Sequence, residues 1–453
     1  MLKHAHLVFI FVILVILLAV LATASVSAAA PLVVVLDFDG AVTPPLADYL
    51  DRGITKAEED DAQACIITMD TPGGLLSSTE DIVKRITGAE VPVVVYVDPW
   101  AGSAGTFITL AAHVAAMAPG SVIGAASPVA GGGEEISETM KKKVTEHAAA
   151  WAEQLARDRG RNEQAAIAAV VEAASYSKDE ALGLDRIEHW EALGLDSPIL
   201  DPPLVDLGAD SLAQLLEKLD GREVTLQSGK VVTLQTQNPV PVIDYVDMTT
   251  IERFLFAISD SNIAYILLSI ATLGIMIELF HPGLILPGVT GGICLFLSIY
   301  SLDMLEANYA GVLLMVLAFG LFVAEFFTPT FGLLTAGGII SLVLGSFILF
   351  SGTPFSIDPK LIAGVVSIFS AIFIFVVAAV IRAHRRRITT GREGLVGQTA
   401  IVQTALDPKG TVLIRGERWN AWVENGTIER GEEVIVTKVE RLKLKVAKEP
   451  KRR

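Results

Sequence analysis

Hydrophobic residues follow three different patterns along the chain, and the first suits an α/β domain. Short apolar runs at residues 32–37, 64–69 and 93–97 contain almost no polar side chain. Such runs are typical of strands that are buried on both faces of a sheet. A helix is predicted over 77–87, between the second and third runs. The resulting β-α-β order predicts a largely parallel sheet.

The second pattern consists of much longer apolar runs. They form five candidate membrane spans, at roughly residues 262–280, 288–305, 308–327, 331–350 and 361–381. Each is close to the length that crosses a hydrocarbon core of about 30 Å. The first span is short and ends at a His-Pro-Gly sequence, so a partial crossing is the alternative for it.

An internal repeat is visible within these spans. The sequence Glu-Leu-Phe-His-Pro at 278–282 resembles Glu-Phe-Phe-Thr-Pro at 325–329, and Gly-Gly-Ile occurs at both 291–293 and 337–339. The repeat predicts two helix pairs of the same orientation, whose glycines allow close packing. A glutamate within a span is a candidate functional group, but both glutamates lie near predicted cytoplasmic ends, which favours interfacial carboxylates.

The third pattern covers residues 391–447, where five short apolar stretches alternate with turn sequences such as Asp-Pro-Lys-Gly. Five short strands in so few residues suit a small all-β barrel such as an OB-fold. Many OB-folds stack bases on aromatic side chains. Only Trp419 and Trp422 are suitably placed here, which does not favour that use.

The N-terminus predicts a signal peptide over residues 1–28. Lys3 precedes an apolar run at 7–21, and Val-Ser-Ala at 26–28 fits a small-x-small cleavage site. An uncleaved anchor helix is the alternative. Export, five crossings and the arginine cluster at 382–387 together predict an extracytoplasmic front and a cytoplasmic tail.

Composition narrows the classes of protein further. Hydrophobic residues make up 52% and charged residues 19% of the 453 residues, which excludes a disordered chain and argues against a wholly soluble one. The net charge of −16 argues against nucleic acid as a partner. Acidic residues dominate the front and basic residues the tail. Cys65 and Cys294 lie in different segments and are not expected to pair.

Two glycine-containing loops follow predicted strand ends, at residues 70–74 and 98–106. In open α/β sheets, sites form at the carboxyl ends of the strands. Ser103 lies in the second loop, just before an apolar helix predicted over 106–117. A serine in this place is either a helix N-cap or a nucleophile whose oxyanion is held by the following N–H groups.

No histidine completes a convincing Ser-His-Asp triad. His113 lies on the predicted apolar helix, His147 on the next helix and His189 in a polar connection. A lysine can act as base instead, because burial favours the neutral amine.

Three consecutive lysines, Lys141, Lys142 and Lys143, open a helix that is predicted to run to about residue 159. An apolar stripe of Met140, Val144, Trp151 and Leu155 places Lys142 on the opposite side, with the other two lysines flanking the stripe. The alternative for all three is a solvated helix start.

The chain resembles the long form of the NfeD proteins, membrane-bound relatives of ClpP-class serine proteases. The similarity extends over nearly all of the chain after the signal peptide. The matching segments are Thr-Pro-Gly-Gly at 71–74, Ser-Ala-Gly-Thr at 103–106, Ala-Met-Ala-Pro-Gly at 116–120, Ile-Gly-Ala-Ala-Ser-Pro-Val at 123–129, Gly-Arg-Asn at 160–162 and Gly-Glu-Arg-Trp at 416–419.

The resemblance implies three domains. A ClpP/crotonase-like α/β serine protease domain over residues 29–225 would lie outside the cytoplasm and be joined by a segment at 226–260 to the membrane region at 261–382. An OB-fold at 391–447 would follow in the cytoplasm. The family's members hydrolyse peptides, and the resemblance implies a stomatin/prohibitin (SPFH)-type membrane partner. The apolar surroundings of the candidate site predict an extended hydrophobic peptide as the substrate. We also expect a homo-oligomer in contact with membrane lipid, with no cofactor and no metal.

The resemblance also assigns a Ser-Lys dyad. Ser103 matches the family's nucleophile and Lys143 its base, and the backbone N–H groups of Gly74 and Ala104 match the donors of the oxyanion hole. The loop before Ser103 is shorter than in the family, with Gly102 in place of an alanine. Three glycines at 131–133 predict that the dyad assembles only when substrate binds. The alternative function is a non-catalytic scaffold for stomatin-like proteins.

Overall fold

The computed structural model of the protein describes residues 30–128, 138–237, 239–328, 330–384 and 392–448. The predicted signal peptide, the three glycines at 131–133 and most of the arginine cluster lie outside these ranges. The chain divides into two compact units, residues 1–328 with 333–370 and residues 329–332 with 371–453. The first unit contains the α/β domain and most of the membrane helices, and the second contains the C-terminal barrel.

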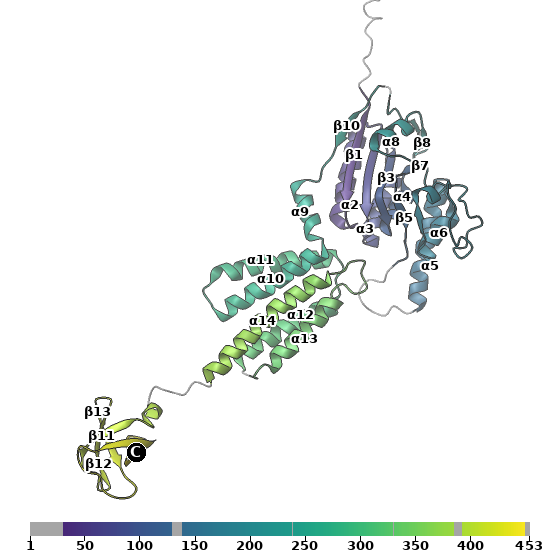
Figure 1. The fold of residues 1–453 in the computed structure, drawn as a ribbon. Helices are drawn as coiled ribbons and strands as arrows, with labels where there is room; N and C mark the ends of the chain where they lie inside the picture. Colours follow the sequence, from purple (N-terminus) through teal and green to yellow (C-terminus); the bar gives the residue numbers. More distant parts are fainter. Residues whose placement is uncertain (1–29, 129–137, 238, 329, 385–391, 449–453) are drawn as a thin grey trace, which may run out of the picture. The chain divides into compact units, whose positions relative to one another are not determined.

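A mainly parallel eight-stranded sheet forms the centre of the α/β domain (Figure 1). Its main path runs in the order β10 (Val242–Tyr245), β1 (Leu32–Asp39), β2 (Ala64–Thr71), β3 (Val93–Gly102), β4 (Val114–Met117) and β7 (Leu207–Gly208). The remaining strands, β5 (Val122–Gly124) and β6 (Ser175–Ser177), extend from the end of β3. The three predicted strands and their parallel order are confirmed.

Helices cover both faces of this sheet. They are α2 (Pro44–Glu59), α3 (Leu76–Thr87), α4 (Ala104–Ala111), α5 (Glu138–Asp158), α6 (Glu163–Val171), α7 (Lys178–Ala181) and α8 (Leu212–Leu219). Successive strand residues point to opposite faces, so Val34 and Leu36 pack with α2 and α3 while Val33 and Val35 pack with α8. A separate hairpin of β8 (Glu223–Thr225) and β9 (Val231–Thr233) borders the second face.

The prediction of an apolar helix over residues 106–117 is wrong for the second half of this range. Helix α4 ends at Ala111, and Val114–Met117 forms β4, parallel to β3. The run is apolar throughout, so its periodicity could not separate a buried helix from a buried strand. The N–H of His113 donates to the carbonyl of Val93, which starts the pairing with β3.

Six helices make up the juxtamembrane and membrane-spanning part: α9 (Thr250–Ile258), α10 (Ser261–Phe280), α11 (Ile285–Met304), α12 (Tyr309–Phe327), α13 (Leu333–Ile348) and α14 (Pro359–His384). Among the described residues, α10, α11, α12 and the first part of α14 are long and apolar enough to cross a membrane. Helix α13 is shorter, so four helices rather than the expected five meet that length.

The internal repeat appears as two helical hairpins with matching carboxylate contacts. Glu278 on α10 accepts a hydrogen bond from the N–H of Gly283, in the turn before α11. Glu325 on α12 accepts from the N–H groups of Leu334 and Thr335, at the start of α13. Both glutamates therefore bind the backbone that leads into the following helix, as an N-terminal cap does.

A closed five-stranded barrel forms the C-terminal domain. Its strands are β11 (Thr399–Thr404), β12 (Lys409–Ile414), β13 (Glu417–Trp422), β14 (Glu433–Glu440) and β15 (Lys443–Lys448), preceded by a 3-10 turn, η1 (Arg392–Leu395). The strands pair in the order β11-β12-β13-β15-β14, in agreement with the predicted OB-fold. All three parts of the predicted fold class are thus present.

Candidate active site

Ser103 lies at the junction of β3 and α4, at the carboxyl end of the central strand. Its backbone has φ 49° and ψ −110°, a region that side-chain-bearing residues rarely occupy. Strained conformations of this kind are concentrated at functional sites. The serine occupies the N-cap position of α4, but its hydroxyl makes no capping hydrogen bond. The N-cap interpretation therefore does not explain this serine.

Two buried contacts hold Ser103 in this conformation. The N–H of Ser103 donates to the carbonyl of Gly124 on the neighbouring strand β5, over 3.0 Å. The buried hydroxyl of Thr106 lies 3.0 Å from the same carbonyl and 3.1 Å from that of Ala101. The end of β3, the start of α4 and β5 are thereby tied together around the serine.

The glycine loop after β2 lies directly against Ser103. A Cβ placed on Gly73 would come within 2.6 Å of the Ser103 Cβ and 3.5 Å of the Ala104 nitrogen. Gly73 has φ 122°, which a residue with a side chain would adopt only with strain. Beside it, a Cβ on Gly74 would overlap the backbone of Val42 at 2.1 Å. Both glycines are required for this close approach.

Ala104 directly follows the serine, and Gly74 adjoins Gly73, which packs against it. The N–H groups of Gly74 and Ala104 have no acceptor among the described residues. Ala104 begins α4, where N–H groups are left free by the helix geometry. The positive end of the helix dipole also points here, which favours negative charge at this position. Two donors beside a free hydroxyl could stabilise the oxyanion of an acyl transfer.

The structure does not bring Lys143 into contact with Ser103. Lys143 is exposed in the second turn of α5, and in the described part of the chain no hydrogen bond joins it to the serine. Lys142 is also exposed and lies 3.7 Å from Glu146, consistent with the predicted solvated charge. The predicted apolar stripe is wrong at its start, because Met140 is exposed and burial begins at Ala148.

Neither His113 nor His147 lies on the same element end as Ser103. His113 follows the C-terminal end of α4 rather than lying on it, whereas Ser103 precedes its N-terminal end. Burial, together with the nearby charges of Arg159 and Arg161, lowers the pKa of His113 to about 3. His147 is exposed on α5.

Two arginines that the sequence analysis gave no role bind the far end of α4. The guanidinium of Arg161 donates to the carbonyls of Thr109, Leu110 and Ala112, over 2.8–3.0 Å. Arg159 donates to the carbonyl of Ala111 over 3.2 Å. Four consecutive carbonyls, those of residues 109–112 at the end of α4, are thus all bound by guanidinium groups. The Gly-Arg-Asn sequence was the available signal, but only as a family marker.

Carboxylates gather at the same edge of the sheet. Burial raises the pKa of Asp70 at the end of β2, and the charges of Asp39 and Asp98 raise it further. The pKa of Asp37 on β1 is raised by burial and by the same two neighbours, together with Asp247. This acidic rim disfavours acidic peptides. Among the described residues, no group of three metal-binding side chains could hold a metal ion.

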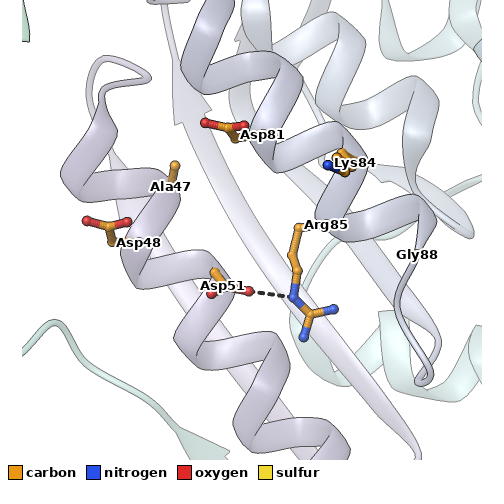
Figure 2. Close-up of a pocket in the computed structure, with 7 residues that line it drawn as sticks. All are labelled: Ala47, Asp48, Asp51, Asp81, Lys84, Arg85 and Gly88. Carbon is orange, nitrogen blue, oxygen red and sulfur yellow. Dashed lines mark hydrogen bonds and ion pairs between the residues drawn. The ribbon is translucent and has the colours of Figure 1, made fainter.

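A cavity of about 390 Å³ lies between α2 and α3 and does not include the predicted catalytic residues (Figure 2). Its lining is charged and consists of Ala47, Asp48, Asp51, Asp81, Lys84, Arg85 and Gly88. The guanidinium of Arg85 is paired with Asp51 at 2.6 Å and with Glu58 at 2.6 Å. These ion pairs link α2 to α3, so a structural role accounts for the charged side chains at this cavity.

Comparison with known families accounts for three segments of the chain. Residues 32–185 match the N-terminal domain of NfeD1b, and residues 262–379 match the NfeD integral membrane domain. Residues 392–448 match the NfeD-like C-terminal, partner-binding domain. The matches follow the same order as the α/β domain, the membrane helices and the barrel.

Two curated proteins are similar over almost the whole length. The membrane-bound protease PH1510 of Pyrococcus horikoshii is 36% identical over 434 residues, 93% of this chain and 94% of that protein. Membrane protein NfeD1b of Bacillus subtilis is 30% identical over 428 residues, 90% and 91% of the two chains. A solved structure, the 1510-N membrane-bound stomatin-specific protease as a lysine-to-alanine mutant with a substrate peptide, is 31% identical. It covers 51% of this chain and 98% of its own, with a TM-score of 0.43.

Proposed function

Because this multi-pass membrane protein belongs to the NfeD family, we propose that it is a membrane-anchored serine endopeptidase that works without ATP. One observation carries the proposal: Ser103 is held at φ 49° with an uncapped hydroxyl, next to Gly73 and Ala104. Among the described residues, the N–H groups of Gly74 and Ala104 in these two segments have no acceptor. A serine that served only as an N-cap would have an extended backbone and a bonded hydroxyl.

In the proposed reaction Ser103 is the nucleophile and Lys143 the base. The neutral amine of Lys143 takes the hydroxyl proton as Oγ attacks the peptide carbonyl. The N–H groups of Gly74 and Ala104 hold the oxyanion of the tetrahedral intermediate. Its collapse breaks the peptide C–N bond, and the leaving amine takes the proton from lysine. Water then hydrolyses the acyl-enzyme and regenerates the serine.

The substrate in this proposal is a hydrophobic peptide segment. Two large apolar side chains next to the candidate site are exposed, Leu76 by 46% and Trp100 by 43%. Leu76 opens α3 directly after the glycine loop, and Trp100 packs its indole against Gly102 just before the serine. Exposed apolar groups around a nucleophile suit an apolar ligand.

A stomatin/prohibitin-type membrane protein is the proposed partner and source of that segment. The solved relative is described as stomatin-specific, and the barrel matches a partner-binding domain. We further propose that the α/β domain lies outside the cytoplasm, that the barrel lies inside and that the protein is a homo-oligomer. Each of these rests on the sequence patterns and the family.

A scaffold for stomatin-like proteins is the second candidate function. The exposure of Lys143 favours it, and so does the lack of a hydrogen bond from Lys143 to Ser103 among the described residues, because a base must come within hydrogen-bond reach of the proton it takes. In the protease, Lys143 makes that contact in the peptide-bound state.

Cleavage of hydrophobic peptides by the full chain in lipid vesicles tests the proposal. We expect Ser103→Ala and Lys143→Ala each to reduce the turnover rate by about 10³-fold or more. Lys142→Ala is the matched control, because the Lys142 side chain is 77% exposed and its one ion pair among the described residues is with Glu146. This variant should retain most activity. Equal losses in the two lysine variants would remove Lys143 from the mechanism.

A further inference from the structure

The short helix α9 (Thr250–Ile258) joins the α/β domain to the first membrane span, and one of its faces packs against the α/β domain. The guanidinium of Arg52 on α2 donates to both carboxylate oxygens of Glu252, over 2.8 Å each. The ring of Phe256 covers Gly40, where an added Cβ would come within 2.9 Å of it. A capping box of Thr249 and Glu252 starts the helix. This face is fixed against the α/β domain.

A second, apolar face runs along the same helix. At about 100° per residue, Ile251, Phe254, Leu255 and Ile258 form one stripe, turned away from Glu252 and Phe256. The two ends of this stripe differ in exposure. Ile258 is buried, whereas Ile251 is 72% and Phe254 48% exposed. The start of the stripe therefore has no cover within the described chain.

The covered end of the stripe belongs to the membrane helices. The carbonyl of Ile258 accepts a hydrogen bond from the hydroxyl of Ser301, near the C-terminal end of α11. The neighbouring Ser259 lies 3.6 Å from the sulfur of Met304, the last residue of α11. The C-terminal end of the stripe thus packs against the end of α11, whereas its N-terminal end, with Ile251 and Phe254, is exposed.

Only two residues, Ser259 and Asp260, separate α9 from the spanning helix α10. Two residues extend over about 7 Å at most, so the end of α9 lies at the level where α10 enters the bilayer. An exposed apolar stripe at that level meets lipid headgroups and the first acyl carbons. Amphipathic helices bind there by burying such a stripe while their charges stay in water.

We propose that α9 is an interfacial helix whose Ile251 and Phe254 insert into the outer boundary of the lipid bilayer. The exposed Arg253 lies outside the stripe, where it faces water and lipid phosphates. Glu252 binds the α/β domain at the same time, so a single helix contacts both the domain and the lipid. This proposal is independent of any peptidase activity, because it uses neither Ser103 nor Lys143.

Site-directed spin labelling of the full chain in phosphatidylcholine vesicles tests this placement. Cys65 and Cys294 are first replaced by alanine, since they are the chain's only cysteines. Single cysteines are then introduced by Ile251→Cys, Phe254→Cys and Arg253→Cys and labelled. Collisions with oxygen, which concentrates in lipid, and with a water-soluble nickel chelate are measured at each site.

We expect labels at 251 and 254 to collide several-fold more often with oxygen than with nickel, and the label at 253 to show the reverse. Similar nickel collisions at all three sites would place the stripe in water and overturn the proposal. Low collision rates with both reagents at 251 and 254 would mean that protein, such as a second copy of the chain, covers the stripe. That result would overturn it as well.

Discussion

The guanidinium of Arg161 lies 2.7 Å from the carboxylate of Asp206, and both side chains are largely removed from solvent. Asp206 in turn accepts a hydrogen bond from the N–H of Ala115, at the start of β4. Arg161 also binds three carbonyls at the end of α4, as described above. This ion pair therefore joins α4, which begins beside the proposed nucleophile, to the strand that follows it.

Removing this arginine should destabilise the α/β domain strongly. Arg161→Met removes the guanidinium from the Asp206 carboxylate and from three carbonyls at the end of α4, and breaking a buried pair in this way costs about 3–5 kcal/mol. Arg222→Met is the control, since Arg222 lies 3.9 Å from Asp206 and is 40% exposed. It should cost less than about 1 kcal/mol. Urea unfolding followed by tryptophan fluorescence measures both, and equal losses would contradict the structural role.

The close approach of the glycine loop to the serine predicts a second effect. Gly73→Ala introduces a Cβ within 2.6 Å of the Ser103 Cβ at a backbone φ of 122°. The loop must move, so we expect peptide cleavage to fall by at least about 10²-fold. Gly120→Ala is the control, because Gly120 also has positive φ but an added Cβ there meets no atom within 4 Å. Full activity in Gly73→Ala would show that the loop does not shape the site.

Acidification should destabilise the α/β domain through His113. Its folded pKa is about 3, below the 6.5 of a free histidine. The unfolded chain therefore binds a proton that the folded chain does not, and stability falls as pH drops from 6.5 toward 3. The expected loss is about 3 kcal/mol at pH 4.5.

Unfolding of His113→Gln at several pH values measures this contribution. The variant should lose less stability than the parent chain on acidification, whatever its stability at neutral pH. His147→Gln is the matched control, because His147 is exposed on α5. Identical slopes in the parent and His113→Gln would exclude His113 as the cause.

The membrane topology depends on α13. The helix is short, but its contacts with α12 extend from one end to the other: Gly311 packs against Leu349, and Glu325 binds the start of α13. A helix that accompanies α12 over its length should cross with it, giving five crossings. Reporter fusions at Gly229 and after residue 448 should then lie on opposite sides. Reporters on the same side would mean that one helix does not cross.

The sequence predicted the parts of the fold that depend on strong patterns. Short apolar runs predicted strands β1 to β3, with helix α3 between the last two, and turn sequences separated the five barrel strands. All of these elements are present. The boundary between α4 and β4 was missed because the run is uniformly apolar. The parallel pairing of Val114–Met117 with β3 decides that this segment is a strand.

The candidate site was predictable only in part, because some of its contacts join residues that are far apart in the sequence. Ser103 and the two glycines lie in short loops at strand ends, so topology alone places them together. The caps on α4 come from Arg159 and Arg161, which are far from it in sequence, and no local signal shows that contact. Lys143 was assigned by resemblance, and among the described residues no hydrogen bond joins it to Ser103.

Covalent labelling of Ser103 tests the central claim most directly. The full chain in lipid vesicles is treated with a fluorophosphonate probe, and the modified peptide is identified by mass spectrometry. We expect modification at Ser103, a loss of labelling in Ser103→Ala, much slower labelling in Lys143→Ala and nearly unchanged labelling in Lys142→Ala. A chain that cleaves peptides while Ser103 stays unmodified, or that is labelled equally in Ser103→Ala, would contradict the assignment of Ser103 as the nucleophile.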